Sequence, residues 1–82
     1  MGENYLTDKL LIHMTEEEEK KEILRNIINT RAALTNANKN FEFADSNDLI
    51  NYYIYRIKSI QAQLDSLIKL AKVRGIEMEK LA

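Results

Sequence analysis

The sequence predicts an all-α fold, an antiparallel two-helix hairpin preceded by a short apolar segment. Three features predict this class. Residues 46–74 carry apolar side chains at alternating spacings of three and four, the chain has no proline and only two glycines (Gly2 and Gly75), and a short segment, residues 41–47, separates two long helix-forming stretches. Side chains three and four apart share one helix face, so the spacing predicts a seam packed against another helix. A short connection makes the two helices antiparallel neighbours.

Length and composition exclude several classes of protein. The 82 residues suffice for one small domain, and the absence of cysteine excludes disulfides and the usual zinc sites. The longest apolar run, residues 10–12, is far shorter than the roughly 20 residues that span a bilayer. The N-terminus lacks the basic flank of a signal peptide. A net charge of −1 offers no general attraction for nucleic acid or anionic lipid. We therefore expect a cytoplasmic protein that binds neither membranes nor nucleic acid.

The first two segments are a lead-in and a helix. Residues 1–14 form an apolar lead-in with a candidate short helix opened by Thr7. The first long helix is expected at about 16–40, because Thr15 and Glu18 have the spacing of a capping box and four glutamates fill the first turn. It presents one apolar stripe, and asparagines near its end favour termination near residue 40. The stripe contains Ile23, Ile27, Thr30, Leu34, Ala37 and Phe41, with Leu24 and Ile28 on its flank.

The turn and the second helix complete a hairpin over residues 15–76. Asp45 or Ser46 is expected to cap a helix at about 46–74. Gly75 followed by an apolar residue is typical of a Schellman C-cap, and residues 77–82 form a tail. Phe41 and Phe43 are expected to close the apolar end of the hairpin. The packing seam of this helix consists of Ile50, Tyr53, Ile57, Ile60, Leu64, Leu67 and Ala71.

A register centred on the turn pairs the two apolar faces. It places Ile23 near Leu64, Ile27 near Ile60, and Leu34 near Tyr53. The acidic residues 16–22 then lie beside the basic end of the second helix, which contains Lys69, Lys72 and Arg74. We interpret the acidic run as cross-helix pairing together with favourable interaction with the helix dipole, and the alternative is an acidic docking site for a basic partner.

The second helix has another nearly uncharged face, opposite the packing seam. We call it the outer strip, and it consists of Tyr52, Tyr55, Ser59, Ala62, Ser66, Leu70 and Val73. A free helix surface normally carries charge at such positions, and tyrosines are enriched at interfaces. The outer strip is therefore predicted to bind a partner. Three occupants stay open: the lead-in of the same chain, a second copy forming a dimeric four-helix bundle, or another protein.

No catalytic, cofactor or metal motif is present. His13 is the only histidine, and it lacks a carboxylate at metal-ligand spacing, so we expect no metal and no cofactor. Glycine-rich phosphate loops and nucleophile motifs are also absent. Asp65 lies at the edge of the packing seam near Lys58, Lys69 and Lys72, which favours a helix-surface ion pair. The chain is therefore not expected to be an enzyme or to take a small-molecule substrate.

Residues 41–72 resemble the YaaL-like family of short uncharacterised proteins from Gram-positive spore-forming bacteria. The resemblance rests on Phe41 and on the runs at residues 48–50, 54–58 and 67–72, and residues 23–40 fit the family's first helix. Gln61 and Leu64 depart from the pattern, at positions where an acidic residue and a tyrosine are expected. The resemblance implies a helical hairpin and assigns no activity.

A weaker resemblance points to a different function. Sporulation-control phosphatases of the Spo-zero-E type are also two-helix hairpins, and they carry a Ser-Gln-Glu-Leu-Asp motif that acts on an aspartyl-phosphate. Residues 61–65 read Gln-Ala-Gln-Leu-Asp and match that motif only at Leu64 and Asp65. The sequence thus favours a non-enzymatic regulatory or adaptor protein, with an Asp65-dependent phosphatase as the alternative.

Overall fold

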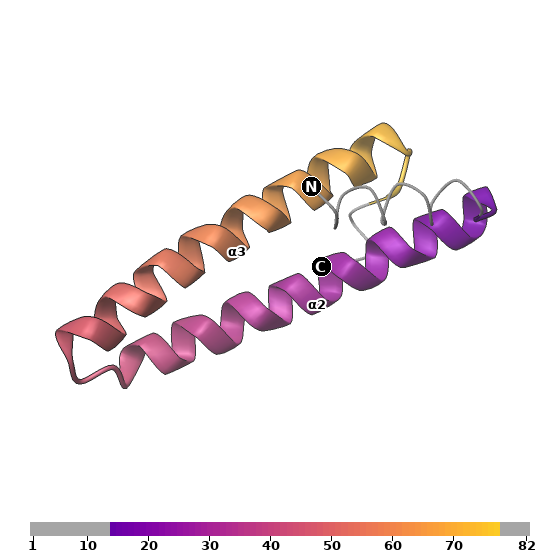
Figure 1. The fold of residues 1–82 in the computed structure, drawn as a ribbon. Helices are drawn as coiled ribbons and strands as arrows, with labels where there is room; N and C mark the ends of the chain where they lie inside the picture. The colour runs from indigo at the N-terminus through magenta and orange to yellow at the C-terminus, as the bar shows by residue number, and fades with distance from the viewer. Residues whose placement is uncertain (1–13, 78–82) are drawn as a thin grey trace.

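The computed structural model describes residues 14–77, which form two helices and the turn between them. Helix α2 spans Glu16–Glu42 and helix α3 spans Asn47–Val73. The two helices run antiparallel and pack against each other (Figure 1). The predicted all-α hairpin is therefore confirmed. The predictions made for residues 1–13, including His13 and the candidate helix at Thr7, lie outside the described residues, as do those for residues 78–82.

The N-terminus of α2 is the predicted capping box. The Thr15 hydroxyl oxygen accepts a hydrogen bond from the Glu18 backbone N–H at 3.1 Å, and the same hydroxyl donates to Glu18 Oε1 at 2.9 Å. Glu16 forms an ion pair with Lys20 one turn later, at 3.6 Å. The Thr15 hydroxyl thus satisfies the Glu18 N–H, which no helical carbonyl can reach, and the glutamates place negative charge at the positive end of the helix dipole.

Replacing Thr15 by alanine is expected to lower the free energy of unfolding by about 1 kcal/mol, because the Glu18 N–H loses its side-chain acceptor. Urea denaturation followed by circular dichroism measures this loss. Thr35→Ala is the matched control, since Thr35 is exposed in the middle of the same helix. It should change the stability by less than about 0.5 kcal/mol. Equal losses for both variants would show that the cap contributes nothing.

Helix α2 continues to Glu42, two residues beyond the predicted end near residue 40. The asparagines in its last turns are weak helix formers, but Ala37 on the same turns is only 2% exposed. Packing of this stripe against α3 outweighs the poor local propensity. The helix ends at Phe43, whose backbone N–H donates to the Asn40 carbonyl at 3.1 Å.

The aromatic residues of the turn do not close the hairpin, so that prediction is wrong. Phe43 is 75% exposed and Phe41 is 36% exposed. Because α2 extends to Glu42, only residues 43–46 separate the two helices, and Phe43 is the C-cap of α2. A connection this short leaves no chain to fold the Phe43 ring back between the helices. The turn therefore presents aromatic surface to solvent.

Both ends of α3 follow the predicted capping chemistry. The Ser46 hydroxyl oxygen accepts a hydrogen bond from the Leu49 N–H at 3.2 Å. At the other end, the Ile76 N–H donates to the Ala71 carbonyl at 2.9 Å and the Gly75 N–H donates to the Lys72 carbonyl at 3.1 Å. These two bonds define a Schellman motif, and Gly75 adopts the positive φ of 71° that the motif requires.

The core of the hairpin is thin and lies between the two apolar faces. Ile23, Ile27 and Ala71 form its buried cluster, with Leu64, Leu67, Leu70 and Ile76 packed around it. Every residue of the predicted packing seam is buried or half-buried. Ala37, Ile60 and Thr30 extend the buried line towards the turn. The 3-4 spacing thus identified the buried face of α3 correctly.

The contacts between the two faces agree with the predicted register only in part. Arg74 contacts Glu19, whereas the predicted register would set Glu19 opposite Ile68 or Lys69. Ile23 and Ile27 lie in one cluster with Ala71, and Leu64, the predicted neighbour of Ile23, packs against that cluster. Antiparallel helices settle where the ridges of one fit the grooves of the other, and the midpoint of the turn does not fix that position.

Candidate protein interface

Six of the seven residues of the outer strip are exposed in the described hairpin. Val73 is 81% exposed, Tyr55 is 70% exposed and Tyr52 is 53% exposed. Ser59, Ala62 and Ser66 are exposed between these larger side chains. Leu70 differs from the others because it is half-buried and packs against the core cluster. The outer strip therefore combines exposed aromatic and aliphatic area with small residues at its centre.

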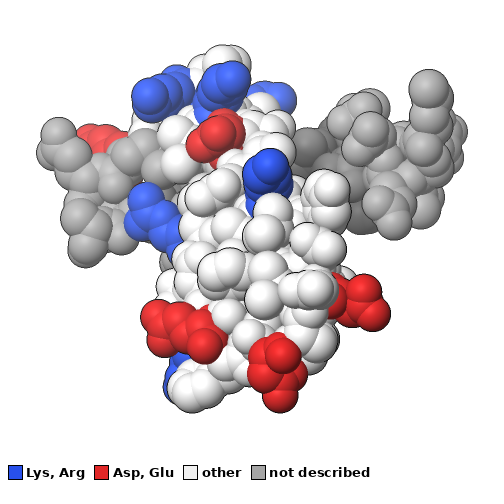
Figure 2. Space-filling model, turned by 90° about the vertical axis from the view of Figure 1, so that its left-hand side faces the viewer, with Lys and Arg blue, Asp and Glu red and all other residues white. Residues whose placement is uncertain are grey.

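The charged residues of α3 that border the outer strip lie along its edges. Figure 2 views the hairpin from the side of its turn and shows a largely uncharged centre, with Asp and Glu in the lower part and most Lys and Arg, together with further acidic side chains, in the upper part. Along α3, Lys58 and Asp65 lie on one edge of the outer strip, while Arg56 lies on the other. A charge-free strip between charged edges is typical of a helix face that another element covers.

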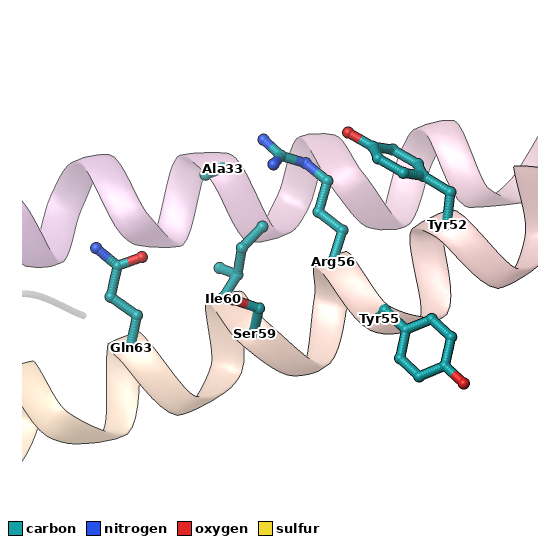
Figure 3. A pocket seen from close by; sticks show the side chains of 7 residues that line it. All are labelled: Ala33, Tyr52, Tyr55, Arg56, Ser59, Ile60 and Gln63. Atoms are coloured by element: carbon teal, nitrogen blue, oxygen red, sulfur yellow. The ribbon is translucent and has the colours of Figure 1, made fainter.

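A shallow groove of about 550 Å³ lies beside the outer strip, between the two helices. Its lining includes Ala33 of α2 and six residues of α3: Tyr52, Tyr55, Arg56, Ser59, Ile60 and Gln63. In Figure 3, Arg56, Ile60 and Tyr52 extend towards α2, whereas Tyr55 points away from it. The Tyr52 ring also meets the Tyr53 ring edge-on, with centroids 4.9 Å apart. A helix laid on the outer strip would therefore also reach the side of α2.

Four residues of this groove are absent from the predicted interface: Ala33, Arg56, Gln63 and Ile60, the last of which belongs to the packing seam. A projection of α3 alone places Arg56 and Gln63 at the edge of the outer strip, so it separates them from the uncharged face. Ala33 belongs to the other helix, and its position beside α3 depends on how the two helices pack. A projection of α3 alone therefore cannot find it.

The acidic run at the start of α2 is explained by contacts inside the hairpin. Arg74 Nη2 lies 2.8 Å from Glu19 Oε1, and the Glu19 side chain is only 11% exposed. That oxygen makes no aligned hydrogen bond, so the contact is a charge pair without hydrogen-bond geometry. Glu22 pairs within the helix with Arg25 at 3.1 Å. The predicted pairing of the acidic run with the end of α3 is thus present at Glu19.

Arg74→Gln is expected to lower the free energy of unfolding by about 1–2 kcal/mol, because it leaves the nearly buried Glu19 carboxylate without its cation. The loss stays below that of a fully buried pair because the Arg74 side chain is 45% exposed. Adding Glu19→Gln should recover part of it. Arg25→Gln is the control, since that pair is more exposed, and it should cost less than about 0.5 kcal/mol. Urea titrations of the wild type and these three variants give these values, and equal effects at Arg74 and Arg25 would contradict the expectation.

Asp65 does not form the predicted helix-surface ion pair. Its carboxylate is exposed on α3, and within residues 14–77 neither Asp65 nor Lys58 takes part in an ion pair or a hydrogen bond. The described part of the chain also holds no group of three or more His, Cys, Asp or Glu residues placed to bind a metal ion. Neither α2 nor α3 combines the length and the apolar character needed to cross a membrane.

Comparison with known proteins identifies a family. A family model described as a protein of unknown function (DUF2508) matches residues 9–78. No curated protein and no solved structure matches the chain. The matched range includes both helices and the acidic first turn of α2, and it is wider than the range of the predicted resemblance. Since the match covers most of the sequence, the chain belongs to this uncharacterised family, whose description assigns no activity.

Proposed function

We propose that this member of the family acts without catalysis, as a small helical regulatory or adaptor protein that binds another protein surface through the outer strip of α3. One observation carries the proposal: six of the seven strip residues are exposed, yet none of the seven is charged. Contiguous apolar surface with charged borders marks protein contact sites. Tyr52 and Tyr55 add large contact areas with polar tips, which suits them to an interface that forms from a soluble state.

The thin core gives a second reason for a partner. Among the described residues, only Ile23, Ile27, Ala37, Ile60 and Ala71 are buried hydrophobic residues. Small domains with so little buried area usually gain stability from metals, disulfides or association. The chain has no cysteine, so disulfides are excluded. Covering the outer strip would bury a second apolar face and add to the stability of the hairpin.

The proposed partner is a protein, either a second copy or a different chain. A net charge of −1 gives no reason to propose nucleic acid or an anionic membrane. We further propose a cytoplasmic location and a relationship to the YaaL-like proteins of Gram-positive spore formers. No cofactor and no small-molecule substrate enter the proposal.

Photo-crosslinking in the native host tests the proposed contact surface. A photoreactive phenylalanine analogue placed at Tyr55 should yield a discrete crosslinked protein, identified by mass spectrometry. The same analogue at Thr35, which is exposed on α2 and outside the strip, is the control and should yield none. Crosslinks from neither position, or equal crosslinks from both, would overturn the proposal.

The Asp65-dependent phosphatase is the alternative function. The exposed Asp65 carboxylate, without an ion pair among the described residues, favours it, because such a group is accessible to an aspartyl-phosphate. If it is correct, the protein accelerates loss of phosphate from a phosphorylated response regulator, and Asp65→Ala abolishes the acceleration. Asp48→Ala, at an exposed aspartate on the same helix, should leave the rate unchanged. No acceleration across a panel of regulators would exclude this function.

A further inference from the structure

We propose that the occupant of the outer strip is a second copy of this chain, with α3 packed antiparallel against α3 of the partner about a twofold axis near Ala62. The inference rests on the proposed function, because it needs the outer strip to be a contact surface. It adds the identity of the partner, the direction of its helix and the residues that meet. Three features of α3 support it: the order of residue sizes, the placement of charge, and the groove beside the strip.

The residue sizes along the outer strip are symmetric about a point between Ala62 and Gln63. Counted outward from that point, Ser59 and Ser66 are equidistant, followed by Tyr55 with Leu70 and then Tyr52 with Val73. An isologous interface requires this symmetry, because residue i contacts residue j of the partner and residue j contacts residue i. Small residues then meet small residues at the centre, and each large side chain meets a large one towards the ends.

This order suits two helices that cross at the centre of the strip. Ser59, Ala62 and Ser66 are exposed and small, so the two backbones can approach closely there. Crossed helices separate towards their ends, where longer side chains fill the wider space. Tyr55, with 70% of its surface exposed, would cover the partner's Leu70. The half-burial of Leu70 in its own hairpin leaves a side available for that contact.

Charge placement selects the antiparallel direction. Lys58 and Asp65 are seven residues apart on the same edge of the strip. In an antiparallel pair the two equivalent edges meet, so Lys58 lies near the partner's Asp65 and Asp65 lies near the partner's Lys58. Both side chains are exposed, and neither forms an ion pair among the described residues of its own hairpin. The dimer would thus bring an opposite charge to each one, and Lys69, which is exposed on the same edge and about as near to the partner's Lys58, offsets part of this attraction.

A parallel pair is disfavoured by the same residues. It would bring the edge with Lys58 against the opposite edge of the partner, which carries Arg56 and Gln63. Lys58 and Arg56 would then face each other at nearly the same level, and like charges repel. In the antiparallel pair, Gln63 meets the partner's Gln63 near the axis, where two amides can both donate and accept hydrogen bonds.

The groove beside the strip extends the contact to α2. Ala33 of α2 and Gln63 of α3 line it together, next to Ser59. A partner helix seated on Ser59, Ala62 and Ser66 would cover this hollow and contact both helices of the first hairpin. The assembly is then a four-helix dimer, which buries far more apolar area than the isolated hairpin.

Engineered cysteines test the direction of the helices, because the natural chain has none. Ala62→Cys alone should form an intermolecular disulfide under mild oxidation. Ser59→Cys alone should not, since the two equivalent Cα atoms are offset along the axis by about 10 Å, beyond the reach of about 7 Å for a disulfide. An equimolar mixture of Ser59→Cys and Ser66→Cys should crosslink as a heterodimer. Crosslinking of Ser59→Cys alone would show a parallel pair and overturn the proposal.

A charge swap tests the ion pairs in the uncrosslinked protein. Sedimentation equilibrium of the full chain should show a dimer, and Lys58→Glu and Asp65→Lys should each raise its Kd about tenfold. The double variant should return the Kd to within about threefold of the wild type, because it exchanges the two charges. Circular dichroism confirms that each variant is folded. A wild type that is monomeric at all concentrations, or a double variant as weak as the singles, overturns the antiparallel dimer.

The two proposals fail separately in these experiments. A monomeric chain whose Tyr55 position crosslinks to a different protein in the host would refute the dimer and leave the contact function standing. A monomeric chain with no Tyr55 crosslink refutes both. A dimer whose Tyr55 position crosslinks to another copy supports both, and the cysteine results then fix the direction of the partner helix.

Discussion

Ile27→Ala is expected to lower the free energy of unfolding by about 2–5 kcal/mol, because it removes a fully buried side chain and leaves a cavity between the helices. Ile27 is 0% exposed and lies in the buried cluster with Ile23 and Ala71. Domains of this size have total stabilities of roughly 5–15 kcal/mol at most, so the variant loses a large share. Urea denaturation at a fixed protein concentration measures the effect, since association would make the midpoint depend on concentration.

Ile28→Ala is the matched control for this prediction. Ile28 has the same chemistry and is the next residue in α2, but it is 55% exposed. Its truncation should cost less than about 1 kcal/mol, because little area is transferred from the interior to water. If Ile28→Ala were as destabilising as Ile27→Ala, the buried face of α2 would be assigned incorrectly. A loss at Ile27 below about 1 kcal/mol would show that this end of the hairpin is loosely packed.

The local features of the fold could be predicted from the sequence because they depend on neighbouring residues. Thr15 and Glu18 form the capping box, Ser46 caps α3, and Gly75 takes the left-handed conformation of a Schellman motif. Each of these involves residues within about one turn of each other. The packing seam of α3 could be predicted for a related reason, since its alternating spacing is a property of one helix.

The contacts between the two helices and the position of the turn could not be predicted from neighbouring residues. The register depends on how side-chain ridges of α2 and α3 fit, and it sets Arg74 beside Glu19. The positions of Phe41 and Phe43 depend on where α2 ends, and packing at Ala37 moves that end beyond the asparagines. Local propensity gives the wrong end for α2, because packing of its buried stripe outweighs it.

Only some residues of the candidate interface can be predicted from the sequence of α3 alone. Projection of α3 predicts which residues form the strip. In the hairpin six of the seven are exposed, and the seventh, Leu70, packs against the core. Leu70 is half-buried because it lies at the border between the outer strip and the packing seam. Ala33 enters the groove only through the register.

Replacing alanine by glutamate is expected to have different effects at two positions of α3, one in the packing seam and one in the outer strip. Ala71 is 0% exposed in the core cluster, whereas Ala62 is exposed on the strip. Ala71→Glu would bury a carboxylate among apolar side chains, and it is expected to lower the free energy of unfolding by more than about 4 kcal/mol. Such a loss removes most of the stability of a hairpin this small, so the helical circular dichroism signal should collapse.

Ala62→Glu should keep that helical signal, because its carboxylate stays in water within the hairpin. It should instead prevent association, since the proposed antiparallel pair places two such carboxylates next to each other near the twofold axis. Circular dichroism and sedimentation of both variants at one concentration separate the outcomes. Loss of the helical signal in both would mean that Ala62 is as essential to the fold as Ala71. An unchanged molecular mass for a dimeric protein carrying Ala62→Glu would place the contact elsewhere on the molecule.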